Sequence, residues 1–411
     1  MDDRTDPLAS FRDRFLHPRT ADGGEAVYLC GNSLGLQPRT AAERLREELD
    51  DWATHGVHGH FEARRPWLRY HEFLAESGAR LVGAQPDEVV HMNTLTVNLH
   101  LMMASFFRPG GARRKILIEE HAFPSDRYAV ESQLRWHGLD PDECLIEASP
   151  REGEECLRDD DLVERIGREG AEIALILLPG VQYYTGQVLD MARLTEAGRA
   201  AGCAVGFDLA HAAGNIPLSL HDWGCDFACW CTYKYLNSGP GAIAGCFVHE
   251  RHVGRTDLPR LAGWWGQDKA TRFEMGPEFH PIPTAEGWQL SNPPVLALAP
   301  VLASLEIFDE AGMDALREKS VALTGTMESR LVERLADRVR IITPSDPSAR
   351  GCQLSLSVSG GAGRNAFEAL TAAGVVCDWR EPDVIRVAPT PLYNRFQDVH
   401  RFVDILEEVL S

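Results

Sequence analysis

CAVGFDLAHAAG, residues 203–214, has the pattern of a buried strand that ends in a polar turn. Its apolar run stops at Asp208, and His211 and Gly214 follow. Because ligands of open α/β sheets bind at the carboxyl ends of the strands, we expect Asp208 to face a ligand. An aspartate that forms a turn and caps the next helix leaves the same pattern, so Asp208 alone does not decide between a binding role and a structural one.

Lys234 follows 26 residues later, in TYKYLNSGPG, residues 232–241. The chain has 37 arginines but only four lysines, and Lys234 is the only lysine or arginine between Arg199 and Arg251. A solvated surface rarely lacks basic residues over such a length, which predicts a buried segment. Burial favours the neutral amine, the form that attacks a carbonyl carbon. The structural alternative is a lysine whose ammonium reaches the surface.

Short apolar runs alternate with helical patterns, which is typical of a parallel sheet covered by helices on both faces. The predicted strands include 116–118, 173–178, 203–207 and 242–248, and the predicted helices include 97–107, 160–168 and 295–308, the last with a kink at Pro300. We predict an α/β protein with an N-terminal arm and part of a small domain at 1–66, a large domain at 67–310, and a C-terminal small domain at 311–411.

A strand-end carboxylate and a buried amine are the two groups that an enzyme dependent on pyridoxal 5'-phosphate must supply. The phosphate needs a site as well, and Thr94 and Thr96 precede a helical pattern whose free backbone N–H groups suit it. An ordinary threonine N-cap explains these hydroxyls equally well. The glycines of GPGAIAG, residues 239–245, do not fit the dinucleotide motif GxGxxG.

Composition narrows the classes of function. Of the 411 residues, 44% are hydrophobic and 25% are charged, as in ordinary globular proteins. The formal net charge of −20 disfavours nucleic acid and anionic membrane surfaces as partners. No apolar run is long enough to span a membrane, and the acidic start, MDDRTDPLAS, lacks a signal pattern. We therefore expect a cytoplasmic protein that acts on a small molecule.

Ten cysteines are scattered without a repeated CxxC, which favours a reducing compartment over a disulfide framework. Cys225, Cys229 and Cys231 lie near His221 in the sequence and could be interpreted as a zinc site. Their apolar surroundings, CDFACWC, favour buried free thiols, so we predict no metal.

Eight motifs give the chain a specific resemblance to a known family. They are YLCGNSLGLQP, HMNTLTVNLH, HAFPSDRYAVESQLRWHG, FDLAHAAGN, CTYKYLNSGPG, LAGWWGQ, LSNPPVL and IRVAPTPLYN. From about Tyr28 to Asn394 the chain resembles kynureninase, a fold-type I pyridoxal phosphate enzyme of the class V aminotransferase group. The resemblance implies an aspartate aminotransferase-like fold with a large, mostly parallel sheet. It also implies hydrolysis of L-kynurenine or 3-hydroxy-L-kynurenine to anthranilate or 3-hydroxyanthranilate and L-alanine.

The resemblance assigns cofactor roles to individual residues. Lys234 would bond to the cofactor, Asp208 would pair with the pyridine nitrogen, and Tyr233 would contact the phosphate. Trp264 and Asn292 would reach the cofactor from a partner subunit, which implies a homodimer with shared active sites. The other implied cofactor contacts are Leu95, Thr96, Phe123, Pro124, Ser125, Asp126 and His211.

The implied substrate contacts are Arg386, Ser33, His60, Ser291 and Asn292. Arg386, in IRVAP, would clamp the substrate α-carboxylate, which a guanidinium can bind through two parallel hydrogen bonds. The side chains of His60, Ser291 and Asn292 would lie near the substrate's aromatic ring. Polar groups built to hold a ring hydroxyl would favour 3-hydroxykynurenine over kynurenine.

Two alternative functions stay open. One is a desulfurase or selenocysteine lyase-like enzyme of the same fold, which needs a mobile acceptor cysteine near the substrate. Cys352 and Cys377 lie in apolar, strand-like surroundings and do not suit that role. The other is a non-catalytic protein that binds pyridoxal phosphate, against which the presence of Lys234, Asp208 and Arg386 argues.

Overall fold

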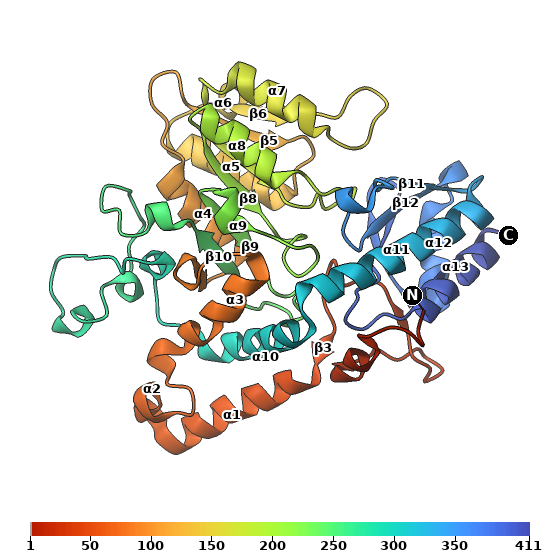
Figure 1. Ribbon diagram of the computed structural model, residues 1–411, viewed down its shortest axis with the longest axis horizontal. Helices are drawn as coiled ribbons and strands as arrows, with labels where there is room; N and C mark the ends of the chain where they lie inside the picture. The colour runs from red at the N-terminus through yellow and green to blue at the C-terminus, as the bar shows by residue number, and fades with distance from the viewer. Residues whose placement is uncertain (1) are drawn as a thin grey trace.

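A seven-stranded sheet forms the centre of the larger part of the molecule in the computed structural model, which describes residues 2–411 (Figure 1). The strands follow one another across the sheet in the order β4 (Val89–His91), β10 (Gly245–Val248), β9 (Phe227–Trp230), β8 (Ala204–Asp208), β7 (Ile173–Pro179), β5 (Lys115–Glu119) and β6 (Leu145–Ala148). The five strands from β9 to β6 are parallel, whereas β10 runs antiparallel to both of its neighbours. Their carboxyl ends therefore share one edge of the sheet.

The strands predicted at 116–118, 173–178 and 203–207 are present as β5, β7 and β8, and every residue of β7 is buried. The strand predicted at 242–248 begins only at Gly245, because the preceding residues form the turn that follows Lys234. The helices of this part are α3 (Ala75–Val82), α4 (Leu95–Phe106), α5 (Pro124–Trp136), α6 (Pro141–Cys144), α7 (Asp159–Glu169), α8 (Met191–Ala200), α9 (Leu220–Trp223) and α10 (Val295–Ala311).

Helix α10 continues through Pro300, where the sequence predicted a kink. Proline removes the N–H that would bond to the carbonyl of Leu296, one turn earlier. Leu296 is exposed, so water can reach this part of the helix. The missing hydrogen bond therefore does not end the helix.

The smaller part of the molecule is built on a four-stranded antiparallel sheet. Its order is β11 (Val339–Ile341), β12 (Leu354–Val358), β15 (Val384–Val387) and β14 (Asp378–Arg380). The helices α11 (Met313–Leu335), α12 (Gly363–Ala372) and α13 (Phe396–Leu410) pack on this sheet and share a separate apolar core with it. Arg386 lies on β15, within this sheet.

The N-terminal arm contacts both parts. Strand β2 (Val27–Tyr28) pairs in parallel with β13 (Val375–Val376) of the smaller part, and β1 (Phe15–Leu16) pairs with β3 (Gln37–Pro38). Helix α1 (Arg39–His55) then runs beside α10, and the short α2 (Gly59–Glu62) follows (Figure 1). The domain boundaries at 66 and 310 stay predictions.

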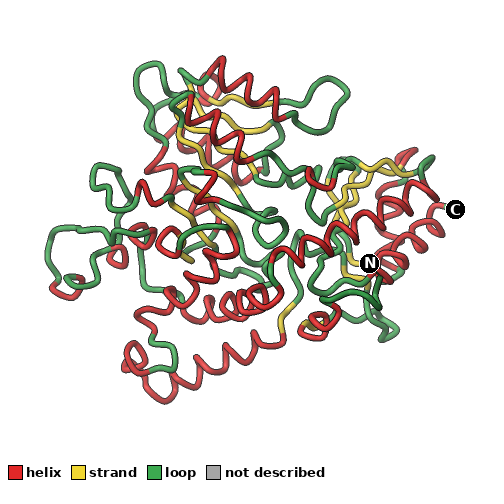
Figure 2. The backbone as a smooth tube through the Cα atoms, in the orientation of Figure 1, coloured by secondary structure: helices red, strands yellow, loops and turns green. Residues whose placement is uncertain are grey.

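The connection between β10 and α10 is mostly loop (Figure 2). Its regular segments are four short 3-10 helices, η5 (Glu250–His252), η6 (Trp264–Gly266), η7 (Arg272–Glu274) and η8 (Ala285–Trp288). The other 3-10 helices of the described chain are η1 (Ala9–Arg14), η2 (Gly56–His58), η3 (Trp67–Leu74), η4 (Pro86–Glu88), η9 (Pro347–Ala349) and η10 (Ser359–Gly361).

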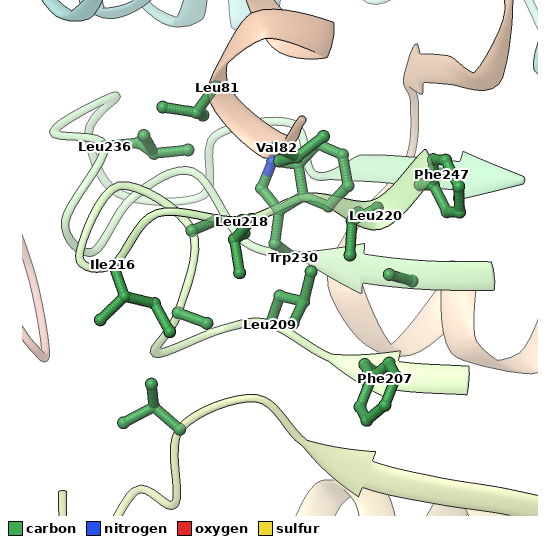
Figure 3. Packing of buried hydrophobic residues seen from close by; sticks show 14 of the residues in the cluster. Leu81, Val82, Phe207, Leu209, Ile216, Leu218, Leu220, Trp230, Leu236 and Phe247 are labelled. Atoms are coloured by element: carbon green, nitrogen blue, oxygen red, sulfur yellow. The ribbon is translucent and has the colours of Figure 1, made fainter. Parts of the chain in front are cut away.

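The main apolar core supports the segment that carries Lys234. Trp230, at the end of β9, packs among buried leucine, valine and phenylalanine side chains from several elements (Figure 3). The Trp230 ring lies so close to Gly245 on β10 that a Cβ there would come within 2.1 Å of it. Only glycine fits at this position, and the tight packing holds the start of the loop after β9 in place.

Candidate active site

A cavity of about 210 Å³ lies at the carboxyl edge of the larger sheet. The ends of β5, β7 and β8, the N-termini of α4 and α5, and the loop after β9 all contribute to it. Its walls combine one amine, three carboxyl groups, a histidine, several hydroxyls and aromatic rings. The lining residues are Thr94, Leu95, Thr96, Glu119, Phe123, Ser125, Asp126, Pro179, Val181, Tyr183, Asp208, Ala210, His211, Tyr233 and Lys234.

The Lys234 amine is held inside this cavity. Its Nζ lies 2.9 Å from Nε2 of His211 and 5.8 Å from the centroid of the Phe123 ring. Burial, and then the positive charges of Lys234 and Arg386, hold the pKa of His211 well below its usual range. His211 is therefore neutral, and its Nε2 can accept a hydrogen bond from Lys234.

Three buried carboxyl groups face the same space. Asp208 accepts a hydrogen bond at Oδ1 from the backbone N–H of Ala210, 2.6 Å away. Burial, followed by the charge of Asp208, raises the pKa of Asp126 well above its usual range. Burial is also the main cause that raises the pKa of Glu119 to about 8. A ligand that brings a positive charge or an N–H donor would complement this group of acids.

Another part of the cavity wall suits an anion. Helix α4 begins at Leu95, and its N-cap, Thr94, makes no side-chain capping hydrogen bond, so backbone N–H groups stay free at the helix start. The hydroxyls of Thr96 and Ser125 lie 2.8 Å apart at the same place. These N–H groups, the helix dipole and the hydroxyls together form a suitable phosphate site.

These residues fit pyridoxal 5'-phosphate. Oδ1 of Asp126 is buried without a hydrogen-bond partner among the described residues, and it lies in the cavity beside Asp208, where a protonated ring nitrogen would find acceptors. Lys234 offers the amine that the cofactor aldehyde requires, and the start of α4 offers the phosphate contacts.

Arg386 lies just behind this cavity. It is 1% exposed, and its Nη1 donates to the carbonyl of Tyr183, a cavity residue, over 2.7 Å. Its Nη2 lies 2.8 Å from Oδ2 of Asp378. The sequence did not identify Asp378 as the partner that holds this guanidinium.

Ser33 and Pro124 also lie outside the cavity lining. Ser33 is part of a turn in which its N–H donates to the carbonyl of Cys30 over 3.0 Å. Two residues later, the N–H of Gly35 donates to the carbonyl of Tyr233 over 2.8 Å, so this turn packs against the Lys234 loop. Pro124 is the first residue of α5, where its fixed φ suits the helix start.

Four other predicted site residues are not brought to Lys234 within this chain. His60 and Asn292 line a different cavity, of about 430 Å³, together with the rings of Trp52 and Trp67. Ser291 is exposed beside Asn292. Trp264 is 43% exposed and lines a surface hollow on the loop between β10 and α10.

Cys225, Cys229 and Cys231 do not come together with His221 as a group of metal ligands in the described part of the chain. Cys225, Cys229 and Cys231 are buried, and the Sγ of Cys229 faces that of Cys246, 3.9 Å away on β10. His221 instead pairs with the buried carboxylate of Glu88. Cys352 and Cys377, which the sequence disfavours as the acceptor of a desulfurase, are also buried, and no cysteine is among the residues that line the Lys234 cavity in the described chain.

Sequence reasoning missed Glu119 and Tyr183 as cavity residues. Glu119 ends the strand KILIE just as Asp208 ends its own strand, so the same strand-end argument would have found it. Tyr183 lies in a loop after β7, and nothing in its local pattern distinguishes it from its neighbour Tyr184.

Comparison with known proteins shows the family. A protein-family model described as "Kynureninase C-terminal domain" matches residues 316–406. Kynureninase from Koribacter versatilis (strain Ellin345) is 58% identical over 401 residues, covering 98% of this chain and 94% of that protein. Kynureninase from Myxococcus xanthus (strain DK1622) is 59% identical over 406 residues, covering 98% and 95%. The chain belongs to the kynureninase family.

Two cysteine desulfurases are among the solved structures that share this fold. The cysteine desulfurase CsdA from Escherichia coli superposes with a TM-score of 0.78 at 19% identity, covering 98% of both chains. The cysteine desulfurase from Thermococcus onnurineus NA1 gives a TM-score of 0.76 at 17% identity, covering 93% of this chain and 94% of that one. At these identities the likeness shows the fold alone, and it confirms the predicted fold-type I architecture.

Proposed function

We propose that this protein uses pyridoxal 5'-phosphate to hydrolyse L-kynurenine or 3-hydroxy-L-kynurenine, giving anthranilate or 3-hydroxyanthranilate and L-alanine. The observation that carries the proposal is the Lys234 amine, held 2.9 Å from neutral His211 in a cavity that also contains Asp208. Membership of the kynureninase family at 58–59% identity supports the choice of substrate.

When bound, pyridoxal 5'-phosphate supplies a ring that accepts electrons from bonds breaking in the substrate. Asp208 would hold a proton on the pyridine nitrogen, and the N–H groups at the start of α4 would bind the phosphate. Lys234 would act as the base that takes the proton from the substrate Cα. Arg386, whose Nη1 donates to the carbonyl of the cavity residue Tyr183, would bind the substrate carboxylate.

We infer that Tyr233 donates a proton in the cleavage step. It lines the cavity next to Lys234, and burial raises the pKa of its phenol above the usual value, so the hydroxyl keeps its proton. A Tyr233→Phe variant that binds the cofactor and cleaves the substrate normally would exclude this role.

The direct test is to supply the purified protein with cofactor and kynurenine and to follow the fluorescence of anthranilate. The proposed function requires anthranilate and alanine in equal amounts. A protein that binds the cofactor but forms neither product would refute it, and release of sulfide from cysteine would support the desulfurase alternative instead.

We also propose a cytoplasmic homodimer with shared active sites. Trp264 and Asn292, which the family pattern places at the cofactor, do not line the Lys234 cavity of their own chain. The loop that carries Trp264 exposes further apolar side chains, among them Phe273 and Met275, which would become buried against a second copy. No helix in residues 2–411 is both long and apolar enough to cross a membrane.

Mixing two inactive variants tests the shared sites. We expect Lys234→Ala and Trp264→Ala each to be nearly inactive alone, because each removes one half of every site. Hybrid dimers would contain one site with both intact residues, so co-refolded or co-expressed mixtures should recover about one quarter of the wild-type kcat. Mixtures that stay inactive although hybrids form would argue against sharing.

The ring substituent is a separate proposal. His60 and Asn292 line one cavity, and Ser291 precedes Asn292 in the sequence. The same surface of a partner subunit would offer these polar side chains to a ring hydroxyl of the substrate. We expect kcat/KM for 3-hydroxykynurenine to exceed that for kynurenine by about tenfold or more. His60→Ala should narrow this ratio, and a wild-type preference for kynurenine would refute the proposal.

A further inference from the structure

Glu119 is a buried carboxylic acid with no assigned role. It is the last residue of β5 and is 4% exposed. Within residues 2–411 no hydrogen bond or ion pair joins its side chain to another residue. A buried carboxyl group without a partner is costly, which calls for an explanation beyond packing.

Glu119 lines two cavities at once. One is the Lys234 cavity, and the other is a hollow of about 220 Å³ between the ends of β5, β6 and β7. This second hollow, here called the outer cavity, is lined by Glu119, Glu120, His121, Pro150, Glu154, Glu155, Leu157, Gln182, Tyr184, Thr185 and Gln187. His121 is exposed, and the side chains of Glu154 and Glu155 are partly exposed, so water reaches it.

The proposed reaction must release a proton. At neutral pH kynurenine enters as a zwitterion with no net charge, and water is the only other reactant. The C–C bond between the β and γ carbons breaks, the β carbon gains hydrogen, and the γ carbon becomes a carboxylic acid. Alanine leaves as a zwitterion and anthranilate leaves as an anion, so each turnover leaves one proton behind. That proton must reach solvent before the site is restored.

We propose that Glu119 carries this proton out of the active site. Its carboxylate accepts a proton from a water molecule or from the new carboxylic acid in the Lys234 cavity, and it then gives the proton to water in the outer cavity. No oxidant, reductant or additional reactant is required. The inference rests on the proposed function, because it is the hydrolysis that generates the proton.

The groups around Glu119 suit a carrier that both gains and loses a proton near neutrality. Burial, followed by the charge of Asp208, raises the pKa of Glu119 to about 8. The titratable groups on the Lys234 side are Asp126, Tyr183, Asp208, His211, Tyr233 and Lys234, and those on the outer side are Glu120, His121, Glu154, Glu155 and Tyr184. On the outer side, Glu154 and Glu155 form ion pairs with Arg158 and Arg340, whereas Glu120 and His121 have no ion-pair partner within residues 2–411 and are the side chains there that can exchange a proton with water.

The Glu119→Gln variant tests the proposal, since glutamine keeps the shape but cannot carry a proton. We expect kcat to fall at least about tenfold with KM within about twofold, and a small diffusible base such as imidazole to restore part of the loss. In weakly buffered solution with an indicator dye, proton release should lag behind anthranilate formation in the variant and coincide with it in the wild type. Glu147→Gln, on the neighbouring strand β6 and outside both cavities, is the matched control.

Stability provides a second measurement that does not depend on activity. The pKa of Glu119 is higher in the folded protein, at about 8, than the ordinary value of 4.5. Between these values the folded state binds more protons than the unfolded state, so the contribution of Glu119 to stability falls as the pH rises through this range. Glu119→Gln lacks this pH dependence, so its Tm relative to wild type should rise from about pH 4.5 to about pH 8 and level off above that range.

The outcomes separate the proposals. If the unsubstituted protein forms no anthranilate from kynurenine, the proposed function fails. If it does, and Glu119→Gln keeps the wild-type kcat with synchronous proton release, the carrier role of Glu119 is refuted. A loss of kcat that no added base restores, with no lag in proton release, would refute it as well and would indicate a structural role.

Discussion

Lys234→Ala should reduce kcat for kynurenine cleavage by at least about 10⁴-fold, because it removes both the amine that bonds to the cofactor and the base that takes the Cα proton. The amine has a specific setting that no nearby lysine can replace. It lies 2.9 Å from His211 inside the cavity, whereas Lys115 and Lys269 form ion pairs with surface glutamates. Initial rates by anthranilate fluorescence provide the measurement.

The same variant should fail to bond covalently to the cofactor, which can be tested without substrate. Wild-type protein treated with pyridoxal phosphate and then with borohydride should retain the cofactor on the peptide that contains Lys234, as identified by mass spectrometry. Lys234→Ala should retain none, while Lys115→Ala should behave as wild type. Attachment to any other lysine in the wild type would contradict the assignment.

Asp208→Asn should lower kcat by about 10²- to 10³-fold, the range typical of losing one charged group that stabilises a transition state. Asparagine keeps an oxygen that can accept the hydrogen bond from the N–H of Ala210, so the turn after β8 should survive. Asparagine has no negative charge, however, and therefore cannot keep the pyridine nitrogen protonated. The substitution therefore separates the cofactor role of Asp208 from the turn-forming role that the sequence left open.

Thermal unfolding and cofactor titration complete this test. We expect the Tm of Asp208→Asn without cofactor to stay close to that of wild type, with the loss confined to kcat. Asp190→Asn, which changes a carboxylate at the start of α8 outside the cavity, serves as the control for a capping aspartate. If both variants lost stability and neither lost activity, Asp208 would be a structural residue.

The parallel part of the fold could be predicted from the sequence because its strands are buried on both faces. Continuous apolar runs made β5, β7 and β8 visible. The strands β4, β6 and β9 were not predicted: all three are only three or four residues long, and His91 and Glu147 interrupt the apolar pattern of β4 and β6. Such short strands are stabilised by neighbours in the sheet rather than by their own pattern.

The site was predictable where a residue has an unusual setting along the chain. Lys234 was distinctive because basic residues are absent around it, and Asp208 because it ends an apolar run. Glu119 has the same strand-end position as Asp208, but a second glutamate and a histidine follow it. Such a polar run is typical of a solvent-exposed turn, so the sequence does not indicate that Glu119 is buried.

The pairing between β2 and β13 has a consequence for how the protein is made. Val27 pairs with Val375, so the ribosome must add about 350 residues after β2 before the partner strand β13 emerges. At about 5–20 residues per second, this takes roughly 20 to 70 seconds. During that interval the N-terminal strand has an unpaired edge, and a nascent chain in this state is a natural client for a chaperone that binds extended apolar segments.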